Sequence, residues 1–171
     1  NIPGYYSSGC NNRTVSYTNH TVLPEALETW NEDLFALRLP RIYMIICEIN
    51  RRFCAELWEA YPGDWERISR MSVVCNHTVR MANLSVVASH TVNGVSALHS
   101  DILKETVFRD FYNYTPDKFT NVTNGIAHRR WLCFSNPGLA ELLDSTIGQG
   151  YRKHPEELSK FAAYANDAQV L

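Results

Sequence analysis

The sequence predicts a mostly helical domain, and three observations lead to that prediction. Apolar residues recur at helical spacing over residues 42–57 and again over 98–107. Proline stands where helices can begin, and glycine stands where they can end. No convincing strand–helix–strand unit is visible between them. The short β-branched stretches between residues 71 and 95 leave the choice between strand and buried helix open.

Composition narrows the class of protein. The 171 residues are 45% hydrophobic and 20% charged, which is typical of a soluble globular domain with a sizeable core. The net charge of -2 does not favour binding to nucleic acid or to an anionic membrane. The apolar runs are too short to span a bilayer, and residues 1–10 lack the features of a signal peptide.

The first half of the chain contains one especially clear helix. We expect Thr21 to cap an early helix from Pro24, and a second helix to begin at Pro40. Pro62 and Gly63 should end that second helix. Its apolar stripe, which we interpret as core, consists of Ile42, Ile45, Ile46, Ile49, Phe53 and Leu57.

Further helices are predicted towards the C-terminus. Asp64 should cap a short helix through Ile68, and the stretch from residue 96 to 112 should form another. Asn136 followed by Pro137 predicts a helix that Gly148 closes, and Pro155 should begin the last one. The side chains expected to face inward in these later helices are Leu98, Ile102, Leu103, Thr106, Val107, Leu158, Phe161 and Ala162.

Cysteines and glycosylation motifs point to different compartments. The five cysteines form no C-x-x-C pair, and we interpret them as core thiols in a reducing cytosol. Asn-x-Ser/Thr motifs would instead suit a secreted glycoprotein. They occur at Asn12, Asn19, Asn76, Asn83, Asn113 and Asn121. A chain rich in Asn, Ser and Thr produces such motifs by chance, so glycosylation is the less favoured interpretation.

No self-contained catalytic motif is present. The chain has no glycine-rich phosphate loop, no G-x-S-x-G and no H-E-x-x-H, and its six histidines are scattered. We therefore expect no metal site. Composition and periodicity alone lead only to a mostly helical domain.

Four longer stretches carry a resemblance to a known family. They are YTNHTVLPEALETW from Tyr17, the helix containing CEINRRF, SHTVNGVSALHSDIL from Ser89 and KFTNVTNGIAHRRWL from Lys118. In sequence, order and spacing they resemble the α-glucan phosphorylases, the enzymes that act on glycogen, starch and maltodextrin. The family most often has Thr-Pro where this chain has Ala127-His128, but the Arg-Arg-Trp that follows is intact.

The resemblance implies an α/β fold with two Rossmann-like domains of glycosyltransferase-B type, of which this chain is an internal part. Residues 1–16 stay unmatched by these motifs. Residues 17–124 correspond to the late part of the N-terminal domain. Residues 125–171 correspond to the crossing between domains and the start of the C-terminal domain.

The resemblance also implies a reaction. Family members transfer the terminal glucosyl unit of an α-1,4-glucan to inorganic phosphate, which yields glucose 1-phosphate with retained configuration. They use pyridoxal 5′-phosphate, whose phosphate group acts as the acid/base partner of the substrate phosphate. The resemblance also implies a cytoplasmic protein that forms a homodimer at full length. The partners expected here are therefore glucan, phosphate and a second copy of the protein, with no nucleic acid or membrane.

Site residues follow from the same matches. His20 matches the histidine whose ring bonds the glucosyl 6-hydroxyl and whose carbonyl faces the developing positive charge. Asn124 matches the asparagine that shares this hydroxyl. Positions that line the cleft beside the sugar correspond to Thr21, Ala26, Glu28 and Val95. Trp131 matches a tryptophan packed beside the cofactor, with Arg130 close by, whereas the lysine that forms the Schiff base lies outside this chain.

Each of these residues also has a purely structural interpretation. Without the resemblance, His20 is a turn residue, Glu28 and Arg130 are solvated charges, and Trp131 is a core residue. The resemblance implies that the chain by itself is inactive, because half of the cleft and the cofactor anchor are absent. The alternative functions are a non-catalytic remnant that binds glucan or a protein partner, and the secreted glycoprotein.

Overall fold

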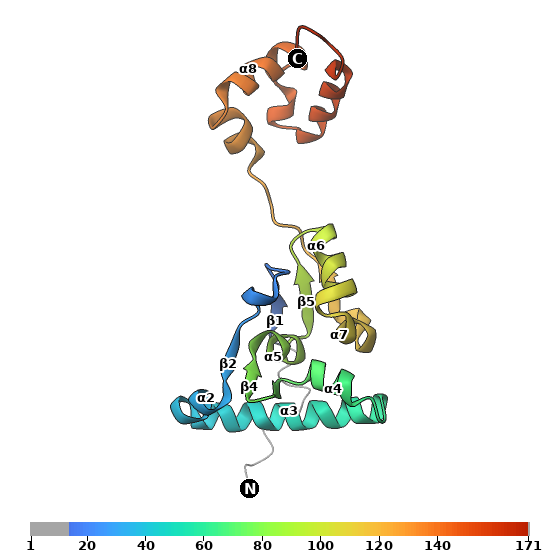
Figure 1. Cartoon of the computed structure of the whole chain (residues 1–171). Helices are drawn as coiled ribbons and strands as arrows, with labels where there is room; N and C mark the ends of the chain where they lie inside the picture. Colours follow the sequence, from blue (N-terminus) through green and yellow to red (C-terminus); the bar gives the residue numbers. More distant parts are fainter. Residues whose placement is uncertain (1–13, 171) are drawn as a thin grey trace. The chain divides into compact units, whose positions relative to one another are not determined.

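The computed structural model describes residues 14–170, which divide between Asn124 and Gly125 into two compact units (Figure 1). We call residues 14–124 the first unit and residues 125–170 the second unit. Helix is the dominant secondary structure in both, which confirms the mostly helical prediction. The predictions for the first 13 residues, including those for Cys10 and Asn12, lie outside the described residues.

The first unit contains six short strands and six α-helices. The strands are β1 (Ser16–Thr18), β2 (Thr29–Asn31), β3 (Val74–Cys75), β4 (Thr78–Arg80), β5 (Thr91–Gly94) and β6 (Phe119–Asn121). The helices are α2 (Glu32–Arg38), α3 (Pro40–Ala60), α4 (Trp65–Met71), α5 (Met81–Ala88), α6 (Ala97–Ile102) and α7 (Arg109–Tyr114). Short 3₁₀ turns at Pro24–Ala26 and Pro116–Lys118 and a π-helical segment at Leu103–Val107 complete it.

Two three-stranded sheets organise this unit. The first has the order β1-β5-β6 and is parallel throughout, with Thr18 opposite Asn93 and Asn93 opposite Thr120. The second has the order β2-β4-β3 and is antiparallel. Because α6 and α7 lie between β5 and β6 in the chain, the expectation of no strand–helix–strand unit was wrong. Strands of three or four residues are too short to reveal a period of two in the sequence.

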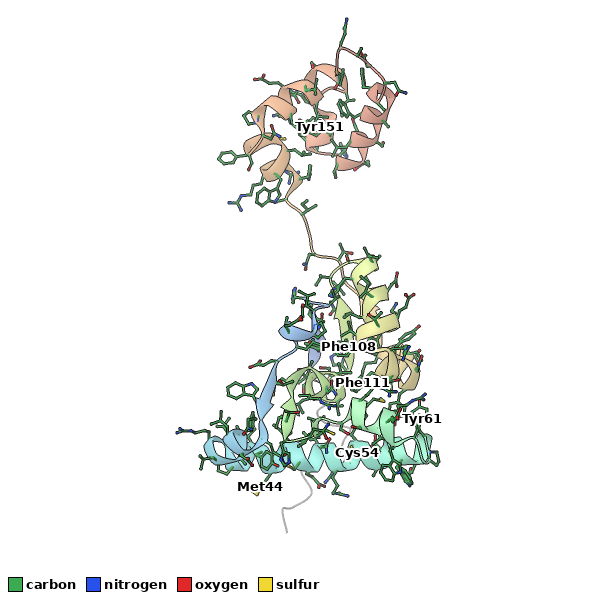
Figure 2. The ribbon with its side chains drawn as sticks, viewed as in Figure 1. Met44, Cys54, Tyr61, Phe108, Phe111 and Tyr151 are labelled. Carbon is green, nitrogen blue, oxygen red and sulfur yellow. The ribbon has the colours of Figure 1, made fainter. Side chains whose placement is uncertain are left out.

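The core of the first unit forms around α3. Phe53 and Leu57 are buried, and the ring of Phe53 stacks on Phe111 of α7 with centroids 6.0 Å apart. Phe108 lies beside Phe111 in the same cluster (Figure 2). Ile42, at the start of the predicted stripe, is 48% exposed and belongs to neither apolar cluster of the unit, whereas its neighbour Tyr43 packs against the second cluster.

Two further positions of the first unit that were predicted to face inward are exposed instead. Leu98 on α6 is 72% exposed, and Thr106 is also exposed. The π-helical segment at Leu103–Val107 explains the exposure of Thr106. A π-turn holds more residues than an α-turn, so it rotates the following side chains away from the face that a 3.6-residue period predicts. Leu103 itself is buried as expected.

The early helix predicted from Pro24 is absent from the described structure, where only a three-residue 3₁₀ turn forms. Thr21 Oγ1 accepts from the Leu23 amide at 3.2 Å rather than capping a helix. The chain then enters β2, whose backbone pairs with β4, and helix α2 begins only after Asn31. Asn31 Oδ1 caps it by accepting from the Leu34 amide at 3.0 Å. Strand pairing therefore outweighed the proline signal.

Most other helix boundaries agree with the sequence. Helix α3 begins at Pro40 and ends at Ala60, before Pro62 and Gly63. Asp64 Oδ1 caps α4 by accepting from the Arg67 amide at 3.0 Å, although α4 continues to Met71 rather than ending at Ile68.

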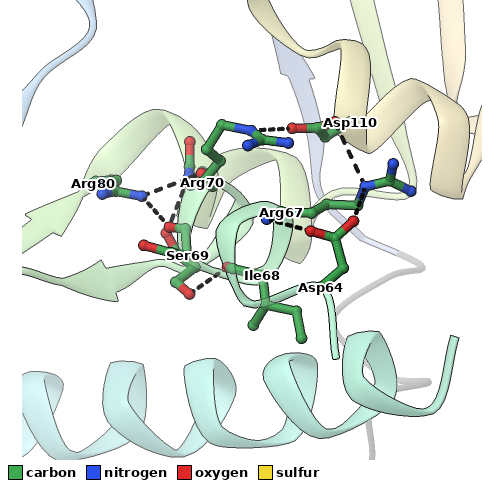
Figure 3. Close-up of polar contacts among 9 residues, drawn as sticks. Asp64, Arg67, Ile68, Ser69, Arg70, Arg80 and Asp110 are labelled. Carbon is green, nitrogen blue, oxygen red and sulfur yellow. Dashed lines mark hydrogen bonds and ion pairs between the residues drawn. The ribbon is translucent and has the colours of Figure 1, made fainter. Parts of the chain in front are cut away.

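Helices α4 and α7 are joined by a polar cluster that Figure 3 shows. Arg70 Nε lies 2.7 Å from Asp110 Oδ2, and Arg67 Nε lies 3.9 Å from Asp110 Oδ1. Arg67 also lies over the ring of Tyr61 at 4.3 Å. Nearby, Arg80 Nη1 donates to the Ser69 carbonyl at 2.6 Å. The contacts with Asp110 fix α4 against α7, and the Arg80 bond ties α4 to β4.

The second unit is a small helical body. Its elements are a π-helical segment at Arg129–Phe134, α8 (Pro137–Thr146) and 3₁₀ helices at Gln149–Arg152 and Pro155–Tyr164. Asn136 caps α8 as predicted, and Gly148 follows it with φ of 77°. Pro155 begins a 3₁₀ rather than an α-helix, and Ala162 on it is exposed.

Tyr151 is the buried centre of the second unit, labelled in Figure 2. Its hydroxyl donates to Asp144 Oδ1 at 3.2 Å, and Arg152 Nη2 lies 2.7 Å from Asp144 Oδ2. Burial raises the pKa of the Tyr151 phenol, so it stays a neutral donor.

The structure bears on the thiols and two of the glycosylation motifs. Cys47, Cys54, Cys75 and Cys133 are free thiols that are partly buried. Asn19 is 1% exposed, and Asn83 Nδ2 donates to the carbonyls of Arg70 and Ser72. A glycan on either amide would have to displace these packed contacts, which argues against the glycoprotein interpretation at both positions.

Candidate functional site

The candidate site lies at the carboxyl ends of three parallel strands. His20 and Thr21 follow β1, Val95 follows β5, and Asn124 comes shortly after β6. Figure 1 shows β1 and β5 side by side with α6 beginning directly after β5. Because parallel strands end at one edge of their sheet, these residues from three distant parts of the sequence share that edge. Ligands of open α/β sheets bind outside this kind of edge.

A buried asparagine builds the turn after β1. Asn19 Oδ1 accepts from the Thr21 amide at 2.8 Å, and Asn19 Nδ2 donates to the Tyr17 hydroxyl at 3.0 Å. The Asn19 amide donates to the Asn93 carbonyl at 3.0 Å, which extends the pairing of β1 with β5. The side-chain oxygen, side-chain nitrogen and backbone amide of Asn19 are therefore all hydrogen-bonded, and they fix the turn that carries the exposed His20.

Asn93 locks β1 and β5 together at the same edge. Its Oδ1 accepts from Thr18 Oγ1 at 3.0 Å, and its Nδ2 donates to the Gly94 carbonyl at 3.2 Å. Asn93 is only 9% exposed, so its bond to the Gly94 carbonyl is buried, whereas its bond from the exposed Thr18 is partly buried. The sequence motifs do not assign Asn93 to the candidate site, but the structure shows that it bonds to Thr18 and Asn19, which precede His20.

The segment after β6 is held against the end of β5. The Val122 amide donates to the Gly94 carbonyl at 3.2 Å, and the Asn124 amide donates to the Val95 carbonyl at 3.0 Å. Ser100 Oγ, on α6, donates to Asn121 Oδ1 at 2.9 Å. The structure thus brings Asn124 and Val95 together through the backbone and leaves the Asn124 side chain exposed.

Lys118 supports β6 from the opposite end. Its Nζ donates to the Val86 carbonyl at 2.7 Å and to the Val87 carbonyl at 3.3 Å, which joins the start of β6 to the end of α5. Burial lowers the pKa of the Lys118 ammonium group. The carbonyls that it bonds offset part of that effect, because hydrogen bonds to the charged form favour it.

His99 was missed by sequence reasoning. It lies on α6, and both of its ring nitrogens approach backbone groups of the loops that carry Thr21 and Val95. The only sequence signal was its place inside the SHTVNGVSALHSDIL stretch.

Ala26 and Glu28 lie in the segment between β1 and β2. Ala26 lies in the exposed 3₁₀ turn at Pro24–Ala26, and Glu28 is exposed just before β2. Glu28 Oε1 accepts from Trp30 Nε1 at 2.6 Å. Within residues 14–170, no hydrogen bond joins either residue to the edge formed by β1, β5 and β6. Their cleft-lining roles stay predictions.

Arg130 and Trp131 belong to the second unit. Trp131 is 61% exposed rather than a core residue, and Arg130 is exposed beside it. The neighbouring Arg129 Nη1 donates to the Arg152 carbonyl at 3.0 Å. His128 Nε2 is buried without a hydrogen-bond partner among the described residues.

Trp131 and Arg130 are of the residue types that could hold a pyridoxal phosphate group. An exposed indole offers a flat face to an aromatic ring, and an exposed guanidinium offers charge to a phosphate group. The described residues contain no group of three or more His, Cys, Asp or Glu side chains that could hold a metal ion. Between residues 14 and 170, no helix combines the length and apolar character that crossing a bilayer requires.

Comparison with known proteins identifies the family of the chain. A family model described as carbohydrate phosphorylase matches residues 7–171. The glycogen phosphorylase of Bacillus subtilis is 54% identical over 158 residues, which are 92% of this chain and 20% of that protein. The chain belongs to the carbohydrate phosphorylase family.

Mammalian members of the carbohydrate phosphorylase family are similar to nearly the same degree. The muscle form of glycogen phosphorylase from Bos taurus is 50% identical over 162 residues, covering 93% of this chain and 19% of the bovine protein. The human muscle form is 49% identical over the same length. The resemblance drawn from four motifs is thereby confirmed. The chain spans about a fifth of the length of these relatives.

Proposed function

We propose that the protein to which this chain contributes is an α-glucan phosphorylase. It would transfer the terminal α-1,4-linked glucose of glycogen or maltodextrin to phosphate and release glucose 1-phosphate with retained configuration. The observation that carries this proposal is the strand edge, where His20, Thr21, Val95 and Asn124 meet at the ends of three parallel strands. Membership in a family that includes glycogen phosphorylases supports it.

The residues of the strand edge have distinct proposed roles. The His20 ring and the Asn124 amide both bind the glucosyl 6-hydroxyl, and Asn19 keeps the His20 turn rigid for this purpose. The His20 carbonyl is a fixed dipole that stabilises positive charge developing at the anomeric carbon. Thr21, Ala26, Glu28 and Val95 line the cleft beside the sugar.

Arg130 and Trp131 are proposed to hold pyridoxal 5′-phosphate. Trp131 packs against the cofactor and Arg130 contributes positive charge near it, as their exposure allows. When bound, the cofactor supplies a phosphate group that serves as an acid/base partner for the substrate phosphate. The Schiff-base lysine would come from a part of the protein outside these residues.

Further parts of the proposal concern the whole protein. We assign residues 17–124 to the late part of an N-terminal Rossmann-like domain, and residues 125–171 to the crossing and the start of a second one. The full protein would be a cytoplasmic homodimer. These 171 residues alone would be inactive, because the family's cofactor lysine and the rest of the cleft lie elsewhere.

The test is phosphorolysis with glycogen, phosphate and pyridoxal phosphate, measured as glucose 1-phosphate release. The full-length protein should be active, His20→Ala should reduce kcat/KM by about 10²-fold or more, and the 171-residue chain should match a blank. His154→Ala is the matched control, because His154 is an exposed histidine of the second unit whose one ion pair among the described residues is with exposed Glu156. An inactive full-length protein, or an unaffected His20→Ala variant, would contradict the proposal.

A second candidate function is a non-catalytic remnant that binds glucan or a protein partner. Exposed apolar side chains of the second unit favour it, since Ile126 is 75%, Trp131 61% and Phe134 84% exposed. Sedimentation of the 171-residue chain tests it. A monomer that binds neither glycogen nor an apolar dye would count against this function.

A further inference from the structure

We propose that His99 is a positioning residue that joins the loop after β1 to the loop after β5, and so sets the spacing between His20 and Asn124. This inference rests on the proposed function and deepens it. His99 is not proposed to contact the substrate. It is proposed to act through the Val95 amide and the Thr21 carbonyl, the two backbone groups that its ring contacts.

The ring of His99 bridges two loops that are far apart in the sequence. The Val95 amide donates to His99 Nδ1 at 3.1 Å. Because an amide can only donate, Nδ1 must be the unprotonated nitrogen, and the proton of the neutral ring is on Nε2. His99 Nε2 lies 3.4 Å from the Thr21 carbonyl, so the ring donates there. One neutral tautomer therefore satisfies both contacts.

The base of the His99 side chain is itself fixed. Ser96 Oγ caps α6 by accepting from the His99 amide at 3.0 Å. Ser100 Oγ lies 2.9 Å from both the Ser96 carbonyl oxygen and Asn121 Oδ1, and these two acceptors share its single proton, which ties the same turn of α6 to β6. Helix α6 thus presents the imidazole from a turn with little freedom to move.

The two contacts lead directly to the residues proposed to bind the sugar. Thr21 follows His20 in the chain, and its amide is already held by Asn19 Oδ1 at 2.8 Å. Val95 is held by His99 through its amide and by the Asn124 amide through its carbonyl at 3.0 Å. The path from His20 to Asn124 therefore runs through Thr21, His99 and Val95.

This path predicts an effect that depends on the sugar 6-hydroxyl. If His99 sets the spacing between His20 and Asn124, its loss should weaken only the interactions that these two residues make. A misplacement of about 1 Å can reduce the rate by about 10²-fold. A substrate without the 6-hydroxyl has no such interaction to lose. A merely structural role of His99 would instead reduce activity on both substrates equally.

The experiment uses the full-length protein in the direction of glucan synthesis, with glucose 1-phosphate and 6-deoxyglucose 1-phosphate as donors. For His99→Ala we expect kcat/KM to fall by about 10- to 100-fold with glucose 1-phosphate and by less than about threefold with the 6-deoxy donor. His90→Ala is the matched control, because His90 is an exposed histidine just before β5 whose ring, within residues 14–170, hydrogen-bonds only to its neighbour Thr91. It should leave both values unchanged.

Two further variants separate the contacts and guard against unfolding. His99→Asn can still accept from the Val95 amide, and His99→Gln can still donate towards the Thr21 carbonyl. Each should retain more activity than His99→Ala with glucose 1-phosphate. An equal loss on both donors, or no loss in any His99 variant, would overturn the inference. An inactive wild-type protein would contradict the proposed function instead, so the two failures are distinguishable.

Discussion

Gly94 and Ser100 lie closer together than any residue with a side chain at position 94 would allow. A Cβ built on Gly94 would lie 2.5 Å from Ser100 Oγ and 2.8 Å from the Ser100 Cα. The end of β5 can therefore pack directly on the first turns of α6. This close approach lets Ser100 reach Asn121, and it places Val95 and His99 at the strand edge.

Replacing Gly94 with alanine should destabilise the first unit. The added methyl group meets backbone atoms of Ser100, which cannot move away as a flexible side chain could. We expect the free energy of unfolding to fall by about 1–3 kcal/mol, as measured by urea denaturation. Gly125→Ala is the control, because a Cβ there meets nothing within 4 Å, and it should change stability by less than about 0.5 kcal/mol. Equal stability of the two variants would contradict the close approach.

Replacing Asn19 with alanine should cost stability and activity together. The substitution leaves the Thr21 amide and the Tyr17 hydroxyl without their partner in a site that is 1% exposed. The expected loss is about 1–3 kcal/mol in the free energy of unfolding. In the full-length protein kcat/KM should fall as well, since the His20 turn loses its support. Asn113→Ala, at an exposed asparagine, should change neither quantity.

Asp110 should matter more for stability than Arg70, although they form one ion pair. The Asp110 side chain is 14% exposed and faces both Arg67 and Arg70, whereas the Arg70 side chain is 52% exposed. We expect Asp110→Ala to cost about 1–3 kcal/mol and Arg70→Ala less than about 1 kcal/mol. A double-mutant cycle in urea measures their coupling. A larger loss for Arg70→Ala would show that this interpretation is wrong.

The ion pairs of Glu48 should make stability depend on acid pH. Hydrogen bonds from Arg51 and then Arg52 hold the pKa of the Glu48 carboxyl at about 2, against an ordinary value of 4.5. A lowered pKa means that the unfolded chain takes up the proton first. The stabilisation is therefore fully present above pH 4.5 and is lost as the pH falls towards 2.

Urea denaturation between pH 2 and pH 6 at low salt tests this dependence. Glu48→Gln should remove part of the dependence of the unfolding free energy on pH that the unsubstituted chain shows. Molar salt should remove the same part, because both ion pairs of Glu48 are exposed. The control is Glu56→Gln on the same helix, since Glu56 is exposed and has no ion pair among those found in residues 14–170. A Glu48→Gln slope equal to that of the unsubstituted chain would contradict the prediction.

Much of the local structure could be predicted because the deciding interactions are short in range. Asp64 caps α4 and Asn136 caps α8 through bonds to amides three residues away, so the sequence displays both partners. The long stripe of α3 was visible for the same reason. The helix expected from Pro24 failed because a distant strand, β4, pairs with the backbone there. Short strands give no such local signal.

Sequence alone determined the family of this chain, most helix boundaries and the identity of the residues proposed to bind the sugar. Tertiary structure decided that His20, Val95 and Asn124 lie at one edge of a sheet. Parallel pairing brings them there, and two of the paired strands, β1 and β5, are more than seventy residues apart in the sequence. Tertiary structure also decided the roles of Asn93, His99 and Ser100, because their hydrogen-bond partners lie on other strands and loops. A hydrogen bond between remote residues leaves no periodic trace in a sequence, because only folding brings its donor and acceptor together.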